Sequence, residues 1–238
     1  MTYDPDLRLL FLHVPKCGGT SMVAALRDQF PADQVFDTYH VEMDTIETEN
    51  YRFITGHFGY RDVAQLPFKR VTVIRDPIDR FLSHMYYWKA RAENGRPNGH
   101  FADAVVTRSL EELLDHMEEG NPVPPMDNLL TWTFAVSENL WARRTLQDQT
   151  PDQVLDIAKQ NLLRFDVVGC LEDLPGFQAD LERVLGLTVD FEVLNTTKSR
   201  PKQDALPDTT LHRLRQLLAL DIALYEWVRG QGAQAEDA

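Results

Sequence analysis

The stretch FLHVPKCGGTSM, residues 11–22, holds the residue types that proteins use to bind a phosphate. An apolar run is followed by a lysine, two glycines and two hydroxyl residues: Lys16, Gly18, Gly19, Thr20 and Ser21. Backbone N–H groups at a helix start attract anions, and bare glycines let an anion approach. Nucleotidases place the lysine after the last glycine. The order here therefore predicts a phosphate loop without the Mg²⁺-nucleotidase pattern; a capped turn with a solvated lysine is the alternative.

A second stretch, VTVIRDPIDRFLSHMYYW at 71–88, carries residues that suit another phosphate. Arg75 follows a predicted strand, at the edge where α/β sheets bind ligands. Ser83 lies about two turns into the helix that should follow, on the same face as Arg80, His84 and Tyr87. A guanidinium fork and a hydroxyl can grip a phosphate together. An ion-paired arginine and an ordinary helix serine are the alternative.

These two stretches resemble the cofactor signatures of the PAPS-dependent sulfotransferases, where PAPS is 3′-phosphoadenosine 5′-phosphosulfate. The variant resembles the bacterial and Golgi-type carbohydrate branch, which includes the heparan 2-O-sulfotransferases, and weaker likeness extends over about residues 8–202. The resemblance implies a P-loop-like loop for the 5′-phosphosulfate, a second site for the 3′-phosphate, PAP as product and no metal. By position it gives cofactor-binding roles to Lys16, Cys17, Gly18, Gly19, Thr20, Ser21, Arg75 and Ser83.

The loop NTTKSRPK at 195–202 is polar and basic. In most proteins such a loop is simply solvated. In the family that the sequence resembles, a basic loop near the C-terminus closes over the cofactor. The resemblance therefore adds Thr197, Lys198 and Arg200 to the expected cofactor site, with Thr196 as a further hydroxyl donor.

Sulfuryl transfer requires a base for the acceptor proton and positive charge on the leaving oxygen. Lys16 is expected to supply the charge. Histidine is the natural base near neutral pH, and His57 ends the predicted strand YRFITGHF in the Gly-His stretch where the resemblance places the catalytic histidine. His13 is a competitor that lies closer to the loop in sequence, and His84 is expected to orient its neighbours. A metal role is disfavoured, because His57 has no partner at ligand spacing.

The elements that must position these residues alternate between strand and helix. Short apolar runs predict strands at 7–14, 51–58, 69–75 and 165–173, and helical spacing predicts helices at 21–30, from Asp76-Pro77 onward, across 109–163 with a break at 120–125, at 174–187 and at 207–229. Residues 94–100 are expected to form a loop. The fold class is therefore α/β, with a mostly parallel central sheet wrapped by helices.

Composition limits the class of protein. The chain has 238 residues, 43% of them hydrophobic, which suits a single domain over about 1–230 with a tail at 231–238 expected to be disordered. Its net charge of −13 disfavours a nucleic-acid partner. No apolar run reaches the roughly 18 residues of a membrane span, and two cysteines suit a reducing compartment, so a cytoplasmic protein is expected.

The sequence is compatible with three functions. The first is transfer of sulfate from PAPS to an acceptor hydroxyl, with a carbohydrate acceptor and the helical segment 101–163 on the acceptor side; tyrosine, a lipid or a small glycoside stay open as acceptors. The second is a nucleotide kinase, which the position of Lys16 disfavours. The third is a catalytically silent protein that binds nucleotide or a partner. Trp132 and Trp141 suit sugar stacking or core packing, and Cys17 is either reactive or buried and inert.

Overall fold

The computed structural model describes residues 4, 6–38, 46–96, 101–136, 143, 145–191 and 200–236. Its strands are β1 (Leu9–Leu12), β2 (Val35–Thr38), β3 (Phe53–Gly56), β4 (Lys69–Ile74) and β5 (Val167–Cys170). Its α-helices are α1 (Gly19–Arg27), α2 (Tyr60–Val63), α3 (Pro77–Glu93), α4 (Ala102–Val106), α5 (Leu110–Glu118), α6 (Leu129–Ala135), α7 (Pro151–Leu162), α8 (Leu174–Leu185), α9 (Asp208–Leu217) and α10 (Ala219–Glu236).

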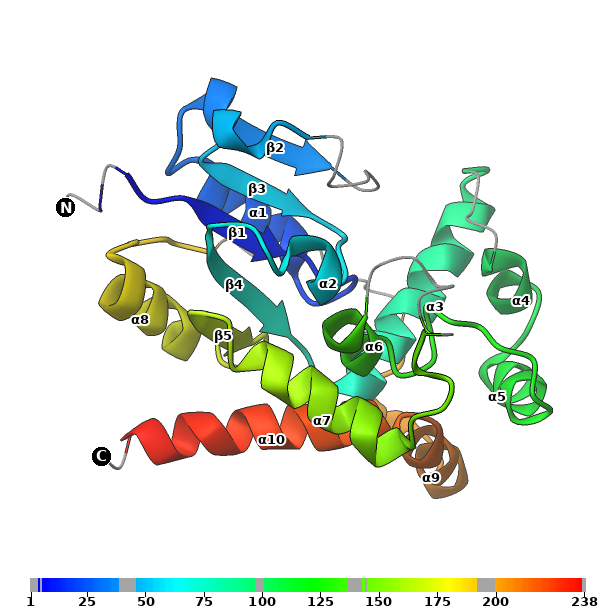
Figure 1. The fold of residues 1–238 in the computed structure, drawn as a ribbon. Coiled ribbons are helices and arrows are strands. Elements are labelled where there is room, and N and C mark those ends of the chain that lie inside the picture. Colours follow the sequence, from blue (N-terminus) through cyan, green and yellow to red (C-terminus); the bar gives the residue numbers. More distant parts are fainter. Residues whose placement is uncertain are drawn as a thin grey trace.

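The five strands form one sheet in the order β2-β3-β1-β4-β5, and every pair of neighbours in it is parallel. Parallel strands need a crossover between them, and helices make most of these crossovers. The predicted α/β class with a parallel central sheet is therefore confirmed. Strand β1 lies at the centre, with β3 on one side and β4 on the other (Figure 1).

Successive side chains of a strand point to opposite faces of a sheet, and here helices bury both faces. Leu9 and Phe11 of β1 belong to a core shared with α1 and α8. Leu10 and Leu12 belong to a second core, shared with α2, α6, α7 and α10. The sheet is thus the middle of three layers, and α7 and α10 run below β5 in the view of Figure 1.

A third core lies beyond the carboxyl ends of the strands, where α3, α4, α5 and α9 pack together. Helix α3 begins as expected: the Asp76 carboxylate accepts a hydrogen bond from the Asp79 N–H at 2.8 Å, and Pro77 occupies the first turn. These helices stand at the arrow tips of the strands in Figure 1. The edge of the sheet that carries the candidate site is therefore walled by a separate helical cluster.

Several elements differ from the expected ones in extent. The segment 109–163 holds three helices, α5, α6 and α7, and the stretch 207–229 divides into α9 and α10 at Leu218. Strand β2 and α2 were not expected, whereas α4 lies within the helical segment expected at 101–163. Helix α10 begins before the expected tail and continues to Glu236.

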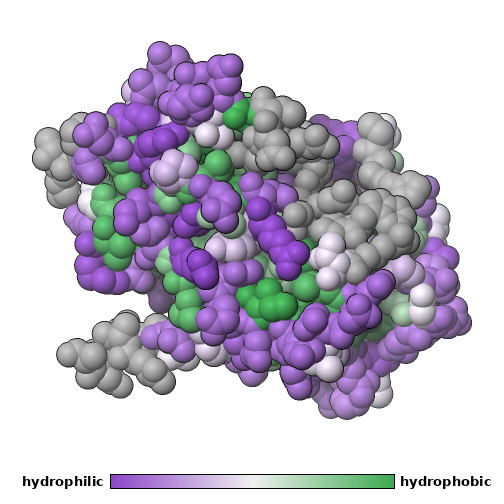
Figure 2. All heavy atoms as spheres, viewed as in Figure 1, coloured by the Kyte–Doolittle hydropathy of each residue, from purple (hydrophilic) through white to green (hydrophobic). Residues whose placement is uncertain are grey.

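The surface of the face seen in Figure 2 is mainly hydrophilic, and apolar residues show there as small separate groups. None of the helices described is long and apolar enough to cross a membrane.

Candidate functional site

Three central strands bring the chemistry-bearing residues of the sequence to one edge. Strand β1 runs into the phosphate loop, β3 ends one residue before His57, and β4 ends one residue before Arg75. Leu12 of β1 pairs with Gly56 of β3 and with Thr72 of β4, so the three strands end close together. Ligands of open α/β sheets bind at this carboxyl edge.

The loop after β1 has the backbone of an anion site. Lys16 and Gly18 both have positive φ, 70° and 79°, on either side of Cys17. Gly18 is the N-cap of α1, a helix of nine residues whose first-turn N–H groups point back toward the loop. At Gly18 a β-carbon would lie 2.6 Å from the Leu171 side chain, so the position requires glycine for both its backbone and its space.

Gly19 has a different role from the one expected of it. A β-carbon at this position would lie 1.8 Å from Nε2 of His13. The imidazole of His13 therefore packs directly on the bare α-carbon of Gly19. The second glycine of the loop makes room for a histidine ring rather than for the anion on that side.

His57 and His13 form a contacting pair. Their ring centroids are 4.5 Å apart with an interplanar angle of 43°. Nδ1 of His57 also lies 2.6 Å from the carbonyl oxygen of His13. A carbonyl oxygen can only accept, so the Nδ1 of the neutral His57 ring carries the proton and Nε2 carries the lone pair.

The other two histidines of the site are poor proton acceptors. Burial, followed by the charges of His57 and Lys16, lowers the pKa of His13 to about 3. Burial also holds the pKa of His84 well below its usual range, with Arg80 and Lys16 adding to the effect. Both rings are therefore neutral at physiological pH and hold a proton weakly. His84 packs against Trp88 at 4.3 Å between ring centroids.

Lys16 is held at both its backbone and its side chain. Its carbonyl oxygen accepts a hydrogen bond from Nη1 of Arg75 at 3.3 Å. Its ammonium nitrogen lies 4.0 Å from the centroid of the Tyr87 ring. Burial, and then the charge of Arg75, lowers the pKa of Lys16 to about 8.

Asp79 joins the two arginines of the expected cofactor site. Its carboxylate accepts from Nη2 of Arg75 at 3.4 Å and from Nη1 of Arg200 at 2.7 Å. The hydrogen bonds to Arg200 and the charges of both arginines keep the pKa of the Asp79 carboxyl low, against the opposing effect of its burial. In the described part of the chain, the buried Nε of Arg75 has no hydrogen-bond partner. At the position expected to bind the second phosphate, the Arg75 guanidinium thus has one N–H group without a hydrogen-bond partner.

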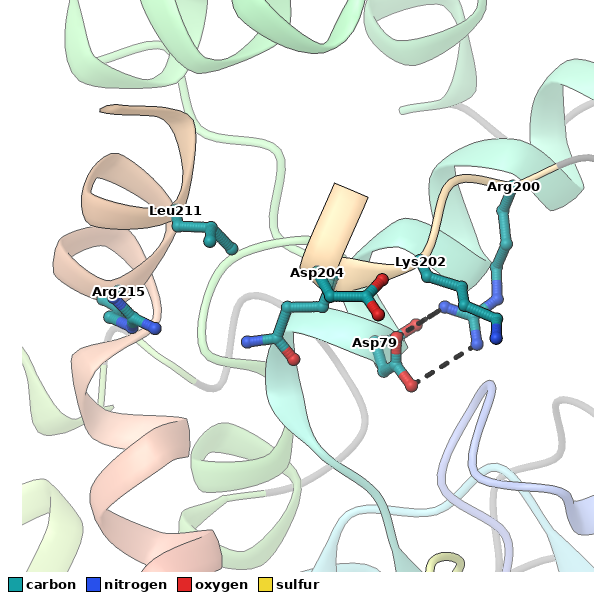
Figure 3. A pocket seen from close by; sticks show the side chains of 7 residues that line it. Asp79, Arg200, Lys202, Asp204, Leu211 and Arg215 are labelled. Atoms are coloured by element: carbon teal, nitrogen blue, oxygen red, sulfur yellow. Dashed lines mark hydrogen bonds and ion pairs between the residues drawn. The ribbon is translucent and has the colours of Figure 1, made fainter. Parts of the chain in front are cut away.

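A pocket of about 500 Å³ lies beside Asp79 (Figure 3). Arg200 and Lys202 flank Asp79 in it, and Leu211 and Arg215 of α9 line the opposite side. The pocket is lined by seven residues: Asp79, Arg200, Lys202, Gln203, Asp204, Leu211 and Arg215. Its lining includes Asp79, the partner of Arg75, but no residue of the phosphate loop.

The inward face of α3 carries the residues that the sequence placed together. Ser83 is 5% exposed and His84 6%, while Arg80 is fully buried. Nη1 of Arg80 donates to the carbonyl oxygen of Pro125 at 3.3 Å. Tyr87, one turn farther along, is the exposed member of this face at 39%.

The remaining expected residues divide by exposure. Thr20 is exposed and Ser21 is partly buried. Cys17 is buried, and that burial raises the pKa of its thiol to about 12, which supports the inert alternative. Thr196, Thr197, Lys198 and Trp141 lie outside the described residues.

A family model described as "Sulfotransferase family" matches residues 1–228 of the chain. The protein belongs to the sulfotransferase family. Among curated proteins, none matches the sequence at a significant level. Among solved structures, the chain is similar to the crystal structure of mouse sulfotransferase SULT7A1 complexed with PAP, with 14% identity and a TM-score of 0.39 over 90% of this chain. The matched part covers 64% of the length of that mouse chain.

In this member of the family, some features of the site were not expected from the sequence. The bridge made by Asp79 had a local signal, since Asp79 lies four residues after Arg75 at a helix start. The packing of His13 on Gly19 had none. Trp132, considered for sugar stacking, is partly buried against the core, and the guanidinium of Arg143 lies 5.0 Å from its ring centroid. The described residues include no group of three or more side chains suited to a metal ion.

Proposed function

We propose that the protein transfers a sulfuryl group from PAPS to an acceptor hydroxyl. The observation that carries the proposal is the hydrogen bond from Arg75 to the carbonyl oxygen of Lys16. It joins the phosphate loop to the second signature, so a single ligand with two phosphate groups can contact both. Membership of the sulfotransferase family supports the same reading.

The residues present suit this donor. The left-handed loop at Lys16 and Gly18, together with the N-terminus of α1, suits the 5′-phosphosulfate. The Arg75 guanidinium suits the 3′-phosphate, together with Ser83 of α3 and Arg200, which precedes α9 in the chain and pairs with Asp79 of α3. Thr20, Ser21, Cys17, Gly19, Thr197 and Lys198 complete the proposed cofactor site.

His57 is the base in this proposal. Its Nδ1–H is held by the His13 carbonyl, which leaves Nε2 as the proton acceptor. His13, with a pKa of about 3, is too weak a base for this task near neutral pH. PAPS supplies the sulfuryl group and a phosphate leaving group. The Lys16 ammonium, one residue before the loop's cysteine, stabilises the negative charge that develops on the leaving oxygen.

The acceptor proposed is a carbohydrate hydroxyl, as in the branch that the two signatures resemble. Helices α4 and α5 belong to the helical cluster at the carboxyl edge of the sheet and suit the acceptor side of the site. A cytoplasmic location is part of the proposal. It rests on Cys17 and Cys170, which are free thiols in the structure and suit a reducing compartment.

A screen of acceptors with sulfur-labelled PAPS and purified protein, without added metal, tests the proposal. The panel holds oligosaccharides, simple glycosides, tyrosine peptides and hydroxylated lipids, with His57→Ala as the control for uncatalysed transfer. Label transferred by the wild-type protein, and not by the control, supports the function. Binding of PAP without transfer to any acceptor would favour a silent nucleotide-binding protein, and Mg²⁺-dependent phosphoryl transfer from ATP would favour a kinase.

A further inference from the structure

The ring of Tyr87 contacts two cations on the exposed end of the α3 face. The Lys16 ammonium lies 4.0 Å from its centroid, and the Arg91 guanidinium carbon lies 5.6 Å from it. Nη1 of Arg91 also donates to the Tyr87 hydroxyl at 3.2 Å. Arg91 thus contacts both the ring and the hydroxyl, whereas Lys16 contacts the ring alone, so a substitution that removes only the hydroxyl leaves the Lys16 contact in place.

None of the titratable groups that act on Lys16 in the described part of the chain carries a negative charge that would stabilise its ammonium at neutral pH. Arg75, at the end of β4, is a cation and opposes it. His13 of the strand end and His84 of α3 are neutral because their pKa values are lowered. The Cys17 thiol, in the same loop, stays protonated because its pKa is raised to about 12. Among the described residues, none of these groups is an anion.

The π face of an aromatic ring attracts a cation, and the attraction grows as water is removed. Burial by itself drives a lysine toward its neutral form. Tyr87 thus supplies the attraction that a carboxylate supplies in an ordinary lysine ion pair. Unlike a carboxylate, a neutral ring adds no negative charge that would repel a phosphate ligand in the adjacent loop.

The main chain of Lys16 is constrained as well. Its φ of 70° is a left-handed conformation that a residue with a β-carbon rarely adopts, and Arg75 holds its carbonyl oxygen. Lys16 is therefore held at two points. Arg75, which follows β4, binds its carbonyl oxygen, and Tyr87 of α3 contacts its ammonium group.

We propose that Tyr87 is the positioning residue of Lys16: its ring face holds the ammonium charged and in place beside the phosphate loop. The contact itself does not depend on what the protein catalyses. Its consequence for sulfuryl transfer rests on the proposed function, since only there does a charged Lys16 stabilise a leaving oxygen.

Competitive labelling of the unliganded protein with trace acetic anhydride across pH 6–11, read by mass spectrometry, measures the pKa of the Lys16 amine directly. Tyr87→Phe keeps the ring and loses the hydroxyl contact to Arg91; Tyr87→Leu keeps apolar cover and loses the ring. We expect a pKa near the wild-type value in Tyr87→Phe, and one lower by about half a unit or more in Tyr87→Leu. Equal values in both variants would overturn the proposal. Lys69, which begins β4 at the opposite edge of the sheet and pairs with Asp166, is the internal control whose labelling profile must stay constant.

A graded substitution keeps the test decisive if Tyr87→Leu does not fold. Phenylalanines with one, two or three ring fluorines at position 87 are nearly isosteric with each other, while each fluorine weakens the attraction of the π face. The proposal requires the Lys16 pKa to fall stepwise along this series, and a flat series contradicts it. Because no PAPS is present, neither outcome depends on whether the protein is an active sulfotransferase.

Discussion

His57 donates its Nδ1–H to the backbone carbonyl of His13 across 2.6 Å, from the end of one central strand to the end of its neighbour. Because the acceptor is a main-chain atom, the position of the acceptor depends on the pairing of β3 with β1 and not on the side chain of His13. It fixes both the orientation of the ring and its tautomer. The basic nitrogen, Nε2, is thereby defined before any ligand binds.

Replacing His57 with Ala should cut turnover by about 10²–10⁴-fold, the usual contribution of a positioned base. PAP binding should change little, since the proposed phosphate contacts come from other residues. Initial rates with saturating donor and calorimetric titration with PAP separate the two effects. His212→Ala, on an exposed position of α9, is the control. Turnover within a few-fold of wild type in His57→Ala would mean that another group takes the proton.

Lys16→Ala should lower the rate of transfer more than it weakens binding of PAP. The charge on the leaving oxygen grows only as the S–O bond breaks, so the lysine contributes most in the transition state. Lys16→Arg should restore activity only in part, because the guanidinium is larger and planar and must replace an amine that packs on Tyr87. Measurements of kcat and of PAP affinity for each variant separate an effect on the transfer step from an effect on binding. A loss confined to binding would remove Lys16 from the chemical step.

Gly19→Ala should disrupt the site through His13. The new methyl group would occupy the place of the imidazole, 1.8 Å from its Nε2, and the ring must leave the α1 terminus. Overpacking a filled site costs on the order of 1–3 kcal/mol. Because this strain falls on the proposed phosphate loop, we expect PAP affinity and turnover to fall by about tenfold. Gly230→Ala on α10, where a methyl group meets nothing within 4 Å, is the matched control. Equal binding by the two variants would show that the His13–Gly19 packing is dispensable.

Cys17 should be unreactive in the folded protein, although it sits beside a lysine at a helix N-terminus. Burial raises the pKa of its thiol to about 12, and Cys170 has a pKa raised to about 12 by the same cause. Only the thiolate reacts, so at pH 8 both thiols should resist alkylation until denaturant is added. Mass spectrometry of iodoacetamide-treated protein measures this. Rapid modification of Cys17 in the native state would contradict its burial.

The sequence predicted the elements whose signals are local. The strand-loop-helix around Lys16 and the helix start at Asp76-Pro77 appear in the structure as expected, because glycine, proline and capping residues act within a few positions. Strand β2, with four residues and no alternation of buried and exposed side chains, has no such signal. Its pairing with β3 is a tertiary contact.

The candidate site likewise contains features that the sequence predicts and features that depend on tertiary packing. The positions of Lys16, His57 and Arg75 at strand ends were predictable because parallel strands share one carboxyl edge. The packing of His13 on Gly19 and the contact of Lys16 with Tyr87 were not, since each depends on how α1 or α3 settles on the sheet. The burial that lowers the pKa of His13 and of Lys16 follows from this packing and not from the spacing of residues.

The preference of the protein for PAP over AMP tests the central claim most directly. The two ligands share the adenosine and the 5′-phosphate and differ in the 3′-phosphate, which the account assigns to Arg75 and Ser83. Loss of charge-assisted contacts of this kind costs about 1.5–3 kcal/mol each. Calorimetric titration should therefore show PAP binding at least about tenfold more tightly than AMP in the wild-type protein, and this preference should disappear in Arg75→Ala. Equal affinity of the wild-type protein for PAP and AMP would contradict the account.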